Sequence, residues 1–159
     1  LTVLETLYMT FVLRPFSYKL ARATLKQPKV YLYDTGEIQG EAAKAENLLA
    51  FHLLKRIHFY QDALGERIEL QYIRDKDGNE VDFAIVKNRR EVLELYEVKL
   101  SEDKIDYALK YYHEKLKPRK SFQVVFNLEK PYEHEGIRVL SPLELFGTPV
   151  WEGHVKEKN

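Results

Sequence analysis

The sequence predicts a mixed α/β fold, in which one β-sheet is flanked by helices. Three consecutive segments between residues 68 and 100 carry the apolar residues of strands and are separated by turn signals, which is typical of an antiparallel meander. A later segment, Phe122–Phe126, is almost wholly apolar and is expected to be a buried strand. Helical patterns precede the meander and separate it from this strand. A sheet with helices packed on its faces accounts for this order of elements.

The first 38 residues predict a short helix followed by a hairpin. Apolar residues recur at helical spacing in Leu1–Met9, and Phe11–Leu13 and Lys29–Tyr33 have the composition of strands. The connector between these strands is basic and contains Arg14, Lys19, Arg22, Lys26 and Lys29. A helix, a hairpin and a basic tip favour the C-terminal part of a winged-helix-like module with its linker over residues 1–38, and a second domain over residues 39–159. A plain surface hairpin is the alternative.

Gly40–Ile57 is the strongest predicted helix. Glu46 falls on the same helical stripe as Leu49 and Leu53, so we expect its carboxylate on the face that is buried. A carboxylate in that place needs a cationic partner or a bound cation. Glu41 is a competing acidic residue, but a charge in the first turn is explained more simply by the helix dipole.

The meander follows this helix. Its first turn contains Asp77-Gly78, a strong hairpin signal, and its second turn spans residues 87–90. The three strands are expected at Ile68–Arg74, Glu80–Val86 and Val92–Leu100.

The rest of the chain predicts a helix, two strands and a short terminal helix. Ser101 with Asp103 is expected to start a helix that runs to about Leu116. Its aromatic face contains Tyr107, Tyr111 and Tyr112, for which core packing is favoured over base stacking. Gly136–Leu140 is the last strand, and Ser141 is expected to cap a helix with Pro142 at its first position.

Asp82, Glu97 and Lys99 form the most informative pattern in the sequence. Glu97 and Lys99 are two residues apart on one strand and therefore point to the same side, with Asp82 on the neighbouring strand. Two carboxylates can hold Mg²⁺, and a lysine beside them can orient or deprotonate water or stabilise a transition state. Glu46 is expected to reach this site as a further acidic ligand. The alternatives are a same-face ion pair at Glu97 and Lys99, and a structural pairing of Glu46 with Lys99.

These motifs resemble a known nuclease superfamily. Gly78-Asn79-Glu80-Val81-Asp82-Phe83, followed by Glu97-Val98-Lys99, is similar to the signature of the PD-(D/E)XK restriction-endonuclease-like proteins, with Val81 in place of the Pro that often precedes the Asp. Together with Pro28–Gly36, the pattern more narrowly resembles the uncharacterised C-terminal domain of archaeal and bacterial AAA+-type ATPases, from about Leu4 to Leu145. The resemblance implies a restriction-endonuclease-like mixed sheet, a Mg²⁺ or Mn²⁺ site at Glu46, Asp82 and Glu97, and hydrolysis of DNA phosphodiesters assisted by Lys99.

Composition narrows the classes of function. The 159 residues include 25 Lys or Arg and 25 Asp or Glu, which argues against a generally basic nucleic-acid binder. Cysteine is absent, which excludes disulfides and thiolate metal sites and fits the cytoplasm. The sequence contains no segment of membrane-spanning length and no P-loop. Because it opens on Leu1, we expect a fragment of a longer protein that carries the ATPase module.

Two functions follow as expectations. The first is a metal-dependent nuclease domain at the C-terminus of an AAA+-type ATPase, with DNA as its substrate. The second is a catalytically inactive module of the same fold, which binds DNA or a partner protein and regulates the ATPase.

Overall fold

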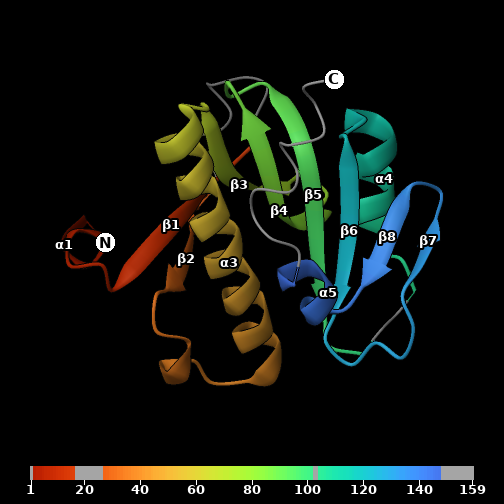
Figure 1. Cartoon of the computed structure of the whole chain (residues 1–159), viewed down its shortest axis with the longest axis horizontal. Coiled ribbons are helices and arrows are strands. Elements are labelled where there is room, and N and C mark those ends of the chain that lie inside the picture. The colour runs from red at the N-terminus through yellow and green to blue at the C-terminus, as the bar shows by residue number, and fades with distance from the viewer. Residues whose placement is uncertain (1, 17–26, 102–103, 148–159) are drawn as a thin grey trace.

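The chain forms three layers, with one mixed β-sheet between helices (Figure 1). The computed structural model describes residues 2–16, 27–101 and 104–147. Within these ranges eight strands form a single sheet in the order β2-β1-β3-β4-β5-β6-β8-β7. The strands are β1 (Thr10–Pro15), β2 (Lys29–Leu32), β3 (Ile68–Arg74), β4 (Glu80–Lys87), β5 (Glu91–Lys99), β6 (Lys120–Val125), β7 (Tyr132–His134) and β8 (Ile137–Leu140). The predicted fold class is therefore confirmed.

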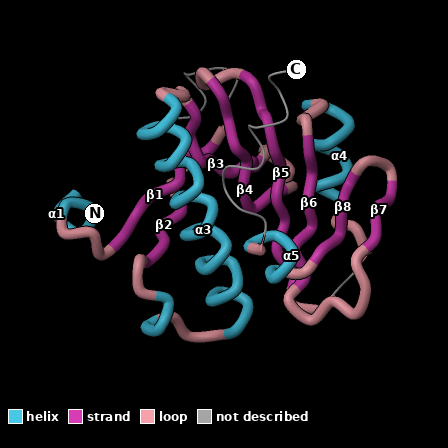
Figure 2. Tube along the Cα trace, viewed as in Figure 1, coloured by secondary structure: helices cyan, strands magenta, loops and turns pink. Residues whose placement is uncertain are grey.

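The meander lies at the centre of the sheet (Figure 2). Strands β3, β4 and β5 pair antiparallel, whereas β6 runs parallel to β5 and β8 runs parallel to β6. The parallel step from β5 to β6 needs a crossover, which the helix α4 (Tyr107–Leu116) provides. The long helix α3 (Glu41–Leu64) precedes the meander.

Each face of the sheet has its own apolar core. On one face, Leu49, Leu53 and Ile57 of α3 pack against inward-facing residues of β3, β4 and β5 such as Phe83 and Tyr96. The short helix α5 (Pro142–Phe146) covers the same face farther along. On the other face, α4 packs through three residues, Ala108, Leu109 and Tyr112. The two cores explain why β4 is apolar at consecutive positions.

The N-terminal hairpin is an edge of this same sheet. β1 pairs antiparallel with β2 and, through Arg14 and Pro15, parallel with β3. The structure does not divide the chain at residue 38, and the assignment of residues 1–38 to a winged-helix-like module stays a prediction. Before β1 lies the short helix α1 (Thr2–Thr6), and after β2 the 3₁₀ turn η1 (Thr35–Glu37). Lys19, Arg22 and Lys26 of the basic connector lie outside the described residues.

Asn47 attaches the hairpin to α3. Its side chain is buried, and it accepts a hydrogen bond from the Leu32 backbone N–H and donates one to the Leu32 carbonyl, both at 2.8 Å. The amide thus acts as a substitute for a neighbouring strand and satisfies both backbone groups at the end of β2.

Besides small shifts at the ends of other elements, three features differ from those expected: the end of α3, the start of α4 and an additional strand. Helix α3 continues to Leu64, because a residue that breaks the helix comes only at Gly65, whose φ of 65° ends it in the left-handed conformation. Helix α4 begins at Tyr107 rather than at Ser101, because Asp106 is its cap and accepts from the N–H groups of Ala108 and Leu109. Residues 102–103, which include the expected Asp103, lie outside the described residues.

The third difference is β7, which the sequence analysis did not predict. All three of its residues are exposed, so its sequence lacks the apolar alternation of a half-buried strand.

The capped helix at Ser141 and Pro142 is confirmed, with a reciprocal hydrogen-bond pair between Ser141 and Glu144. None of the helices within the described ranges has both the length and the apolar character that a membrane crossing requires.

We predict that Asn47→Ala lowers the free energy of unfolding by about 2 kcal/mol, because two buried backbone groups of Leu32 lose their partner. Urea denaturation measures the change. Asn127→Ala, at an exposed position, is the matched control and should change stability by less than about 0.5 kcal/mol. Equal effects of the two substitutions would contradict this role for Asn47.

Candidate functional site

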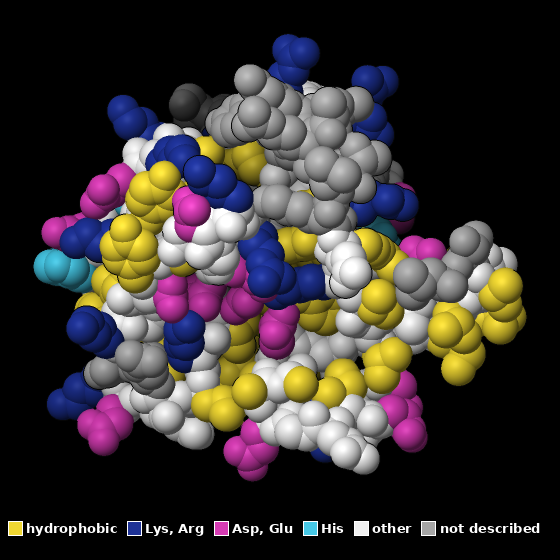
Figure 3. All heavy atoms as spheres, turned by 180° about the vertical axis from the view of Figure 1, so that it is seen from behind, with side chains coloured by type: hydrophobic (Ala, Val, Ile, Leu, Met, Phe, Trp, Pro, Cys, Tyr) yellow, Lys and Arg dark blue, Asp and Glu magenta, His cyan; other side chains and the backbone are white. Residues whose placement is uncertain are grey.

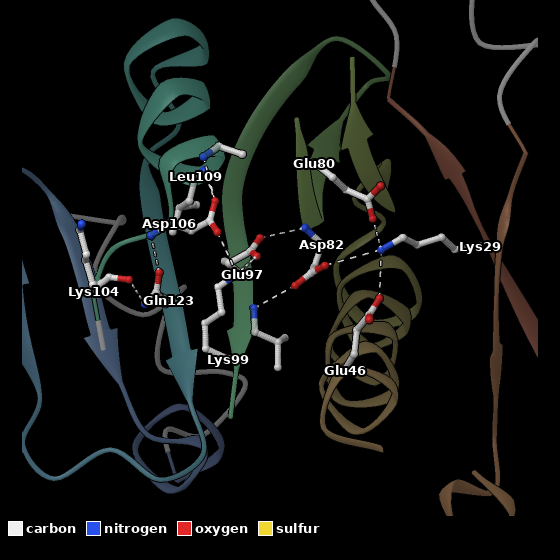
Figure 4. A network of polar contacts seen from close by, with 12 residues as sticks. Lys29, Glu46, Glu80, Asp82, Glu97, Lys99, Lys104, Asp106, Leu109 and Gln123 are labelled. Carbon is white, nitrogen blue, oxygen red and sulfur yellow. Dashed lines mark hydrogen bonds and ion pairs between the residues drawn. The ribbon is translucent and has the colours of Figure 1, made fainter. Parts of the chain in front are cut away.

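Asp82 and Glu97 lie side by side where the ladder between β4 and β5 ends. The last ladder pair toward this end is Phe83 with Tyr96. One step beyond it, the backbone N–H of Val98 donates to Asp82 Oδ2 at 2.9 Å, and the backbone N–H of Asp82 donates to Glu97 Oε2 at 3.3 Å. Side-chain carboxylates therefore take the place of backbone acceptors, and each acid is held by the main chain of the opposite strand (Figure 4).

Lys99 connects this pair to the start of α4. Its Nζ donates to Glu97 Oε1 at 2.9 Å and lies 2.8 Å from Asp106 Oδ2. Asp106 in turn is fixed by Gln123 on β6, whose buried amide oxygen accepts from the Asp106 backbone N–H at 2.8 Å. The amide nitrogen of Gln123 donates to the carbonyl of Lys104 at 2.9 Å. Gln123 thus anchors the connection from β5 to α4 and positions the acid that holds Lys99.

Lys29 of β2 enters the site from the other side. Its Nζ lies 3.0 Å from Glu46 Oε1, 2.5 Å from Glu80 Oε1 and 3.6 Å from Asp82 Oδ1. Figure 4 shows the ammonium group between these carboxylates, which come from α3 and β4. Tyr31, also on β2, donates its hydroxyl to Glu46 Oε1 at 2.7 Å. Glu46 is therefore held against the hairpin.

Burial and repulsion by a neighbouring carboxylate raise the pKa values of the two central acids. The side chains of Asp82 and Glu97 are only 16% and 8% exposed. Burial, followed by the negative charge of Glu46, raises the pKa of Asp82 to about 6. Burial, followed by the charge of Asp82, raises the pKa of Glu97 to about 8. The nearby lysines offset these effects only in part.

The lysines of the site are held in their charged form. Burial alone would lower the pKa of Lys29, but Asp82, Glu80 and Glu46 together raise it well above its usual value. Burial likewise opposes the charge of Lys99, but hydrogen bonds to Asp106 and Glu97 raise its pKa. Both lysines therefore act as fixed positive charges near neutral pH.

The predicted site residues stand in two connected groups. Asp82, Glu97 and Lys99 are in direct contact, and the expected shared side of Glu97 and Lys99 is confirmed. Glu46 joins them through Lys29 rather than through Lys99, so the alternative pairing of Glu46 with Lys99 is wrong. Glu46 is 31% exposed and lies at the margin of the buried face of α3.

Sequence reasoning missed Lys29, Asp106 and Gln123. Lys29 begins a predicted strand, but the sequence analysis assigns its charge to the basic connector and not to the acidic site. Asp106 caps α4, whereas the sequence analysis assigned the helix start to Ser101 with Asp103. Gln123 carried a usable signal, because an amide inside an almost wholly apolar strand needs buried hydrogen-bond partners.

The donor set fits an oxygen-preferring divalent cation. The carboxylates of the site outnumber its cations. Lys29, Lys99 and Arg74, whose Nε lies 3.4 Å from Glu80 Oε2, face five of them, those of Glu46, Glu80, Asp82, Glu97 and Asp106. Asp82 and Glu97 are adjacent, and hard cations prefer such ligands. In the described part of the chain, no three acidic or histidine side chains are already grouped at metal-binding geometry. Some of these carboxylates would therefore have to exchange an ammonium contact for the ion.

Figure 3 shows the face of the molecule opposite to that seen in Figure 1. Asp and Glu side chains gather near its centre, and Lys and Arg side chains lie beside them.

The aromatic face of α4 is divided between the core and the surface. Tyr112 is buried, as favoured from the sequence, whereas Tyr107 and Tyr111 are 72% and 37% exposed. Their rings are nearly parallel, with centroids 6.4 Å apart, and Tyr107 directly follows Asp106.

Comparison with known proteins gives one family. A family model described as "Domain of unknown function (DUF4143)" matches residues 41–146. This range contains Glu46, Asp82, Glu97 and Lys99, whereas Lys29 precedes it. Searches of curated proteins and of solved structures found no match.

We predict that Glu97→Gln stabilises the protein at high pH relative to the wild type. Because the folded state raises the pKa of Glu97 to about 8, folding favours the protonated acid. Stability from this group is complete below about pH 4 and is lost as the pH rises through 8. The difference in unfolding free energy between variant and wild type should grow by on the order of 4 kcal/mol from pH 5 to pH 8.5.

Urea denaturation at the two pH values measures this difference. Glu129→Gln, at an exposed position, serves as control and should shift the unfolding free energy equally at both. A Glu97→Gln profile parallel to that of the wild type would mean that Glu97 is not a buried, charge-repelled acid.

Proposed function

The chain belongs to the DUF4143 family, and we propose that it is a nuclease-like domain that hydrolyses DNA phosphodiesters with the help of a divalent cation. The observation that carries the proposal is the contact of Asp82, Glu97 and Lys99 at the diverging ends of β4 and β5. An acidic pair beside a fixed ammonium is the arrangement that cleavage of a charged ester needs.

Each residue has a distinct role in this proposal. Asp82 and Glu97 would hold Mg²⁺ or Mn²⁺, with Glu46 as a further ligand or a partner of bound water. The bound ion supplies charge relief at the phosphate and lowers the pKa of water. Lys99 remains protonated, so we assign it to positioning the attacking water and stabilising charge rather than to removing a proton.

The order of strands supports the nuclease-like interpretation. The sequence-based resemblance implies a first core helix that carries an acid, followed by an antiparallel meander with acids on its second and third strands, and further strands. Helix α3, strands β3–β5, helix α4 and strand β6 follow that order. Fold alone does not establish activity, which rests on the site.

Tyr107 and Tyr111 support a nucleic acid as the substrate. Two exposed, nearly parallel aromatic rings lie along α4, whose capping residue contacts Lys99. Lys115, one turn farther on, lies 4.8 Å from the centre of the Tyr111 ring and adds positive charge. Bases stack on such aromatic side chains, and single strands are bound in this way.

A second candidate function is a nuclease-like module without catalysis. The observation in its favour is that Lys29 and Lys99 together contact all five acids and partly neutralise them without a metal ion. In that case the domain would bind DNA or a partner protein. DUF4143 domains are known from contexts associated with AAA-type ATPases, so we propose an ATPase module as the partner, in the cytoplasm.

Nuclease assays with Mg²⁺ test the leading proposal. We predict that the wild-type chain cleaves DNA, and that Asp82→Asn and Lys99→Met each lower the rate by about 100-fold or more. Asp77→Asn and Lys87→Met change similar residues away from the site and should retain activity. Residual cleavage that is equal in all five proteins would indicate contamination and overturn the proposal.

We predict that Tyr107→Ala and Tyr111→Ala weaken binding of single-stranded DNA, because each removes a stacking surface worth about 1–3 kcal/mol. Fluorescence anisotropy in Ca²⁺ measures the affinity without relying on cleavage. Tyr132→Ala is the matched control, since Tyr132 is 39% exposed but lies on β7. If all three variants bind alike, α4 is not the binding surface.

A further inference from the structure

Three carboxylates converge on one ammonium group at the edge of the candidate site. Lys29 Nζ is within 3.6 Å of an oxygen of Glu46, Glu80 and Asp82. Glu46 and Glu80 are within hydrogen-bond distance of the ammonium group, whereas Asp82 makes a longer ion pair with it. A multivalent cation also requires several acids around it, and these three would have to move closer together to bind one, since they are not at metal-binding geometry in the described structure.

The surroundings hold Lys29 in this position. Its side chain is 23% exposed, and the ring of Tyr72 lies 5.5 Å from its nitrogen. Tyr31, two residues farther along β2, fixes Glu46 from the same side. Pairing of β2 with β1, together with the Asn47 amide, places the strand itself. The contact is therefore built into the sheet rather than made by a surface side chain.

We propose that Lys29 is a built-in cation that occupies the position of a second metal ion, so that the site takes one divalent cation and not two. The inference rests on the proposed function, because it assigns the remaining position, at Asp82 and Glu97, to the divalent ion. Two-metal sites place a second dication where it neutralises acids shared with the first. Here Asp82 is the shared acid, with one oxygen toward Lys29 and the other bound by the Val98 N–H on the Glu97 side.

The complete site includes a residue that lies outside the range of the family match. The family match covers residues 41–146, which contain the acids, whereas Lys29 lies on the hairpin that precedes this range. The hairpin is thus a component of the site and not only an edge of the sheet. Lys29 is a positioning residue in this account, because it acts through Glu46 and Asp82.

Counting bound Mn²⁺ by electron paramagnetic resonance and calorimetry tests the proposal. The wild-type chain should bind one ion, and Lys29→Met should bind two, because the carboxylates of Glu46 and Asp82 lose their ammonium partner and form a second site with Glu80, whose other oxygen faces Arg74. Lys87→Met is the matched control, since Lys87 pairs with the single acid Glu66 at 2.7 Å. It should bind one ion. If Lys29→Met gains no ion relative to the wild type, the proposal is overturned.

The same count separates this inference from the proposed function. If the wild type binds no ion and Lys29→Met binds one, Lys29 stands as the built-in cation, while metal-dependent cleavage by the wild type fails. If the wild type binds two ions, Lys29 does not occupy a metal position, whatever the protein cleaves.

A chemical rescue keeps the test decisive if Lys29→Met fails to fold. The chain has no cysteine, so Lys29→Cys introduces a single thiol. Alkylation with 2-bromoethylamine in denaturant, followed by refolding, restores an ammonium group, whereas 2-iodoethanol adds a neutral group of similar length. The first product should bind one Mn²⁺ and the second product two. Equal stoichiometry, or recovery of neither product as a folded protein with or without Mn²⁺, would assign Lys29 a structural role only.

Discussion

The exchange of hydrogen bonds between Asp82 and Glu97 is the constraint on which the site depends. Where β4 and β5 stop pairing, each strand would leave backbone N–H groups without acceptors in a partly buried place. The two carboxylates accept those hydrogens and are thereby fixed against each other. As a result, two acids are buried next to each other, which disfavours their charged forms and raises their pKa values. The remaining contacts of the site can be understood as responses to that excess of negative charge.

The responses come from both sides of the sheet centre and from segments far apart in sequence. The ammonium group of Lys99 balances the charge of Glu97 and forms an ion pair with Asp106. Gln123 on β6 accepts a hydrogen bond from the Asp106 backbone and so fixes its position. On the opposite side, Lys29 forms ion pairs with Asp82 and with Glu46 of α3, and its charge partly balances theirs. The site therefore couples the N-terminal hairpin, the meander and the crossover helix. A substitution in any of these supports would change the electrostatics at Asp82 and Glu97 without touching either residue.

Patterns carried by short, contiguous segments were the most predictable part of this protein. The period of two along a strand sufficed to place Glu97 and Lys99 on one side, because the geometry of a strand is local. The meander was predictable from its turns, and the α5 cap from Ser141 and Pro142. The start of α4 was less predictable, because Ser101 and Asp106 are both residue types that commonly cap helices. A hydrogen bond from the Asp106 backbone to the distant Gln123 accompanies the choice of Asp106.

The sequence by itself determined the mixed α/β class, the meander, and the trio of Asp82, Glu97 and Lys99, since each depends on residue types at fixed spacing. Only the tertiary structure decided which partners complete the trio. It joined the hairpin to the sheet edge, turned Glu46 toward Lys29 and Tyr31, and left Tyr107 and Tyr111 exposed while Tyr112 entered the core. The physical reason is that ion pairs and burial depend on distances between elements, and spacing along the chain fixes no distance beyond the element that contains it.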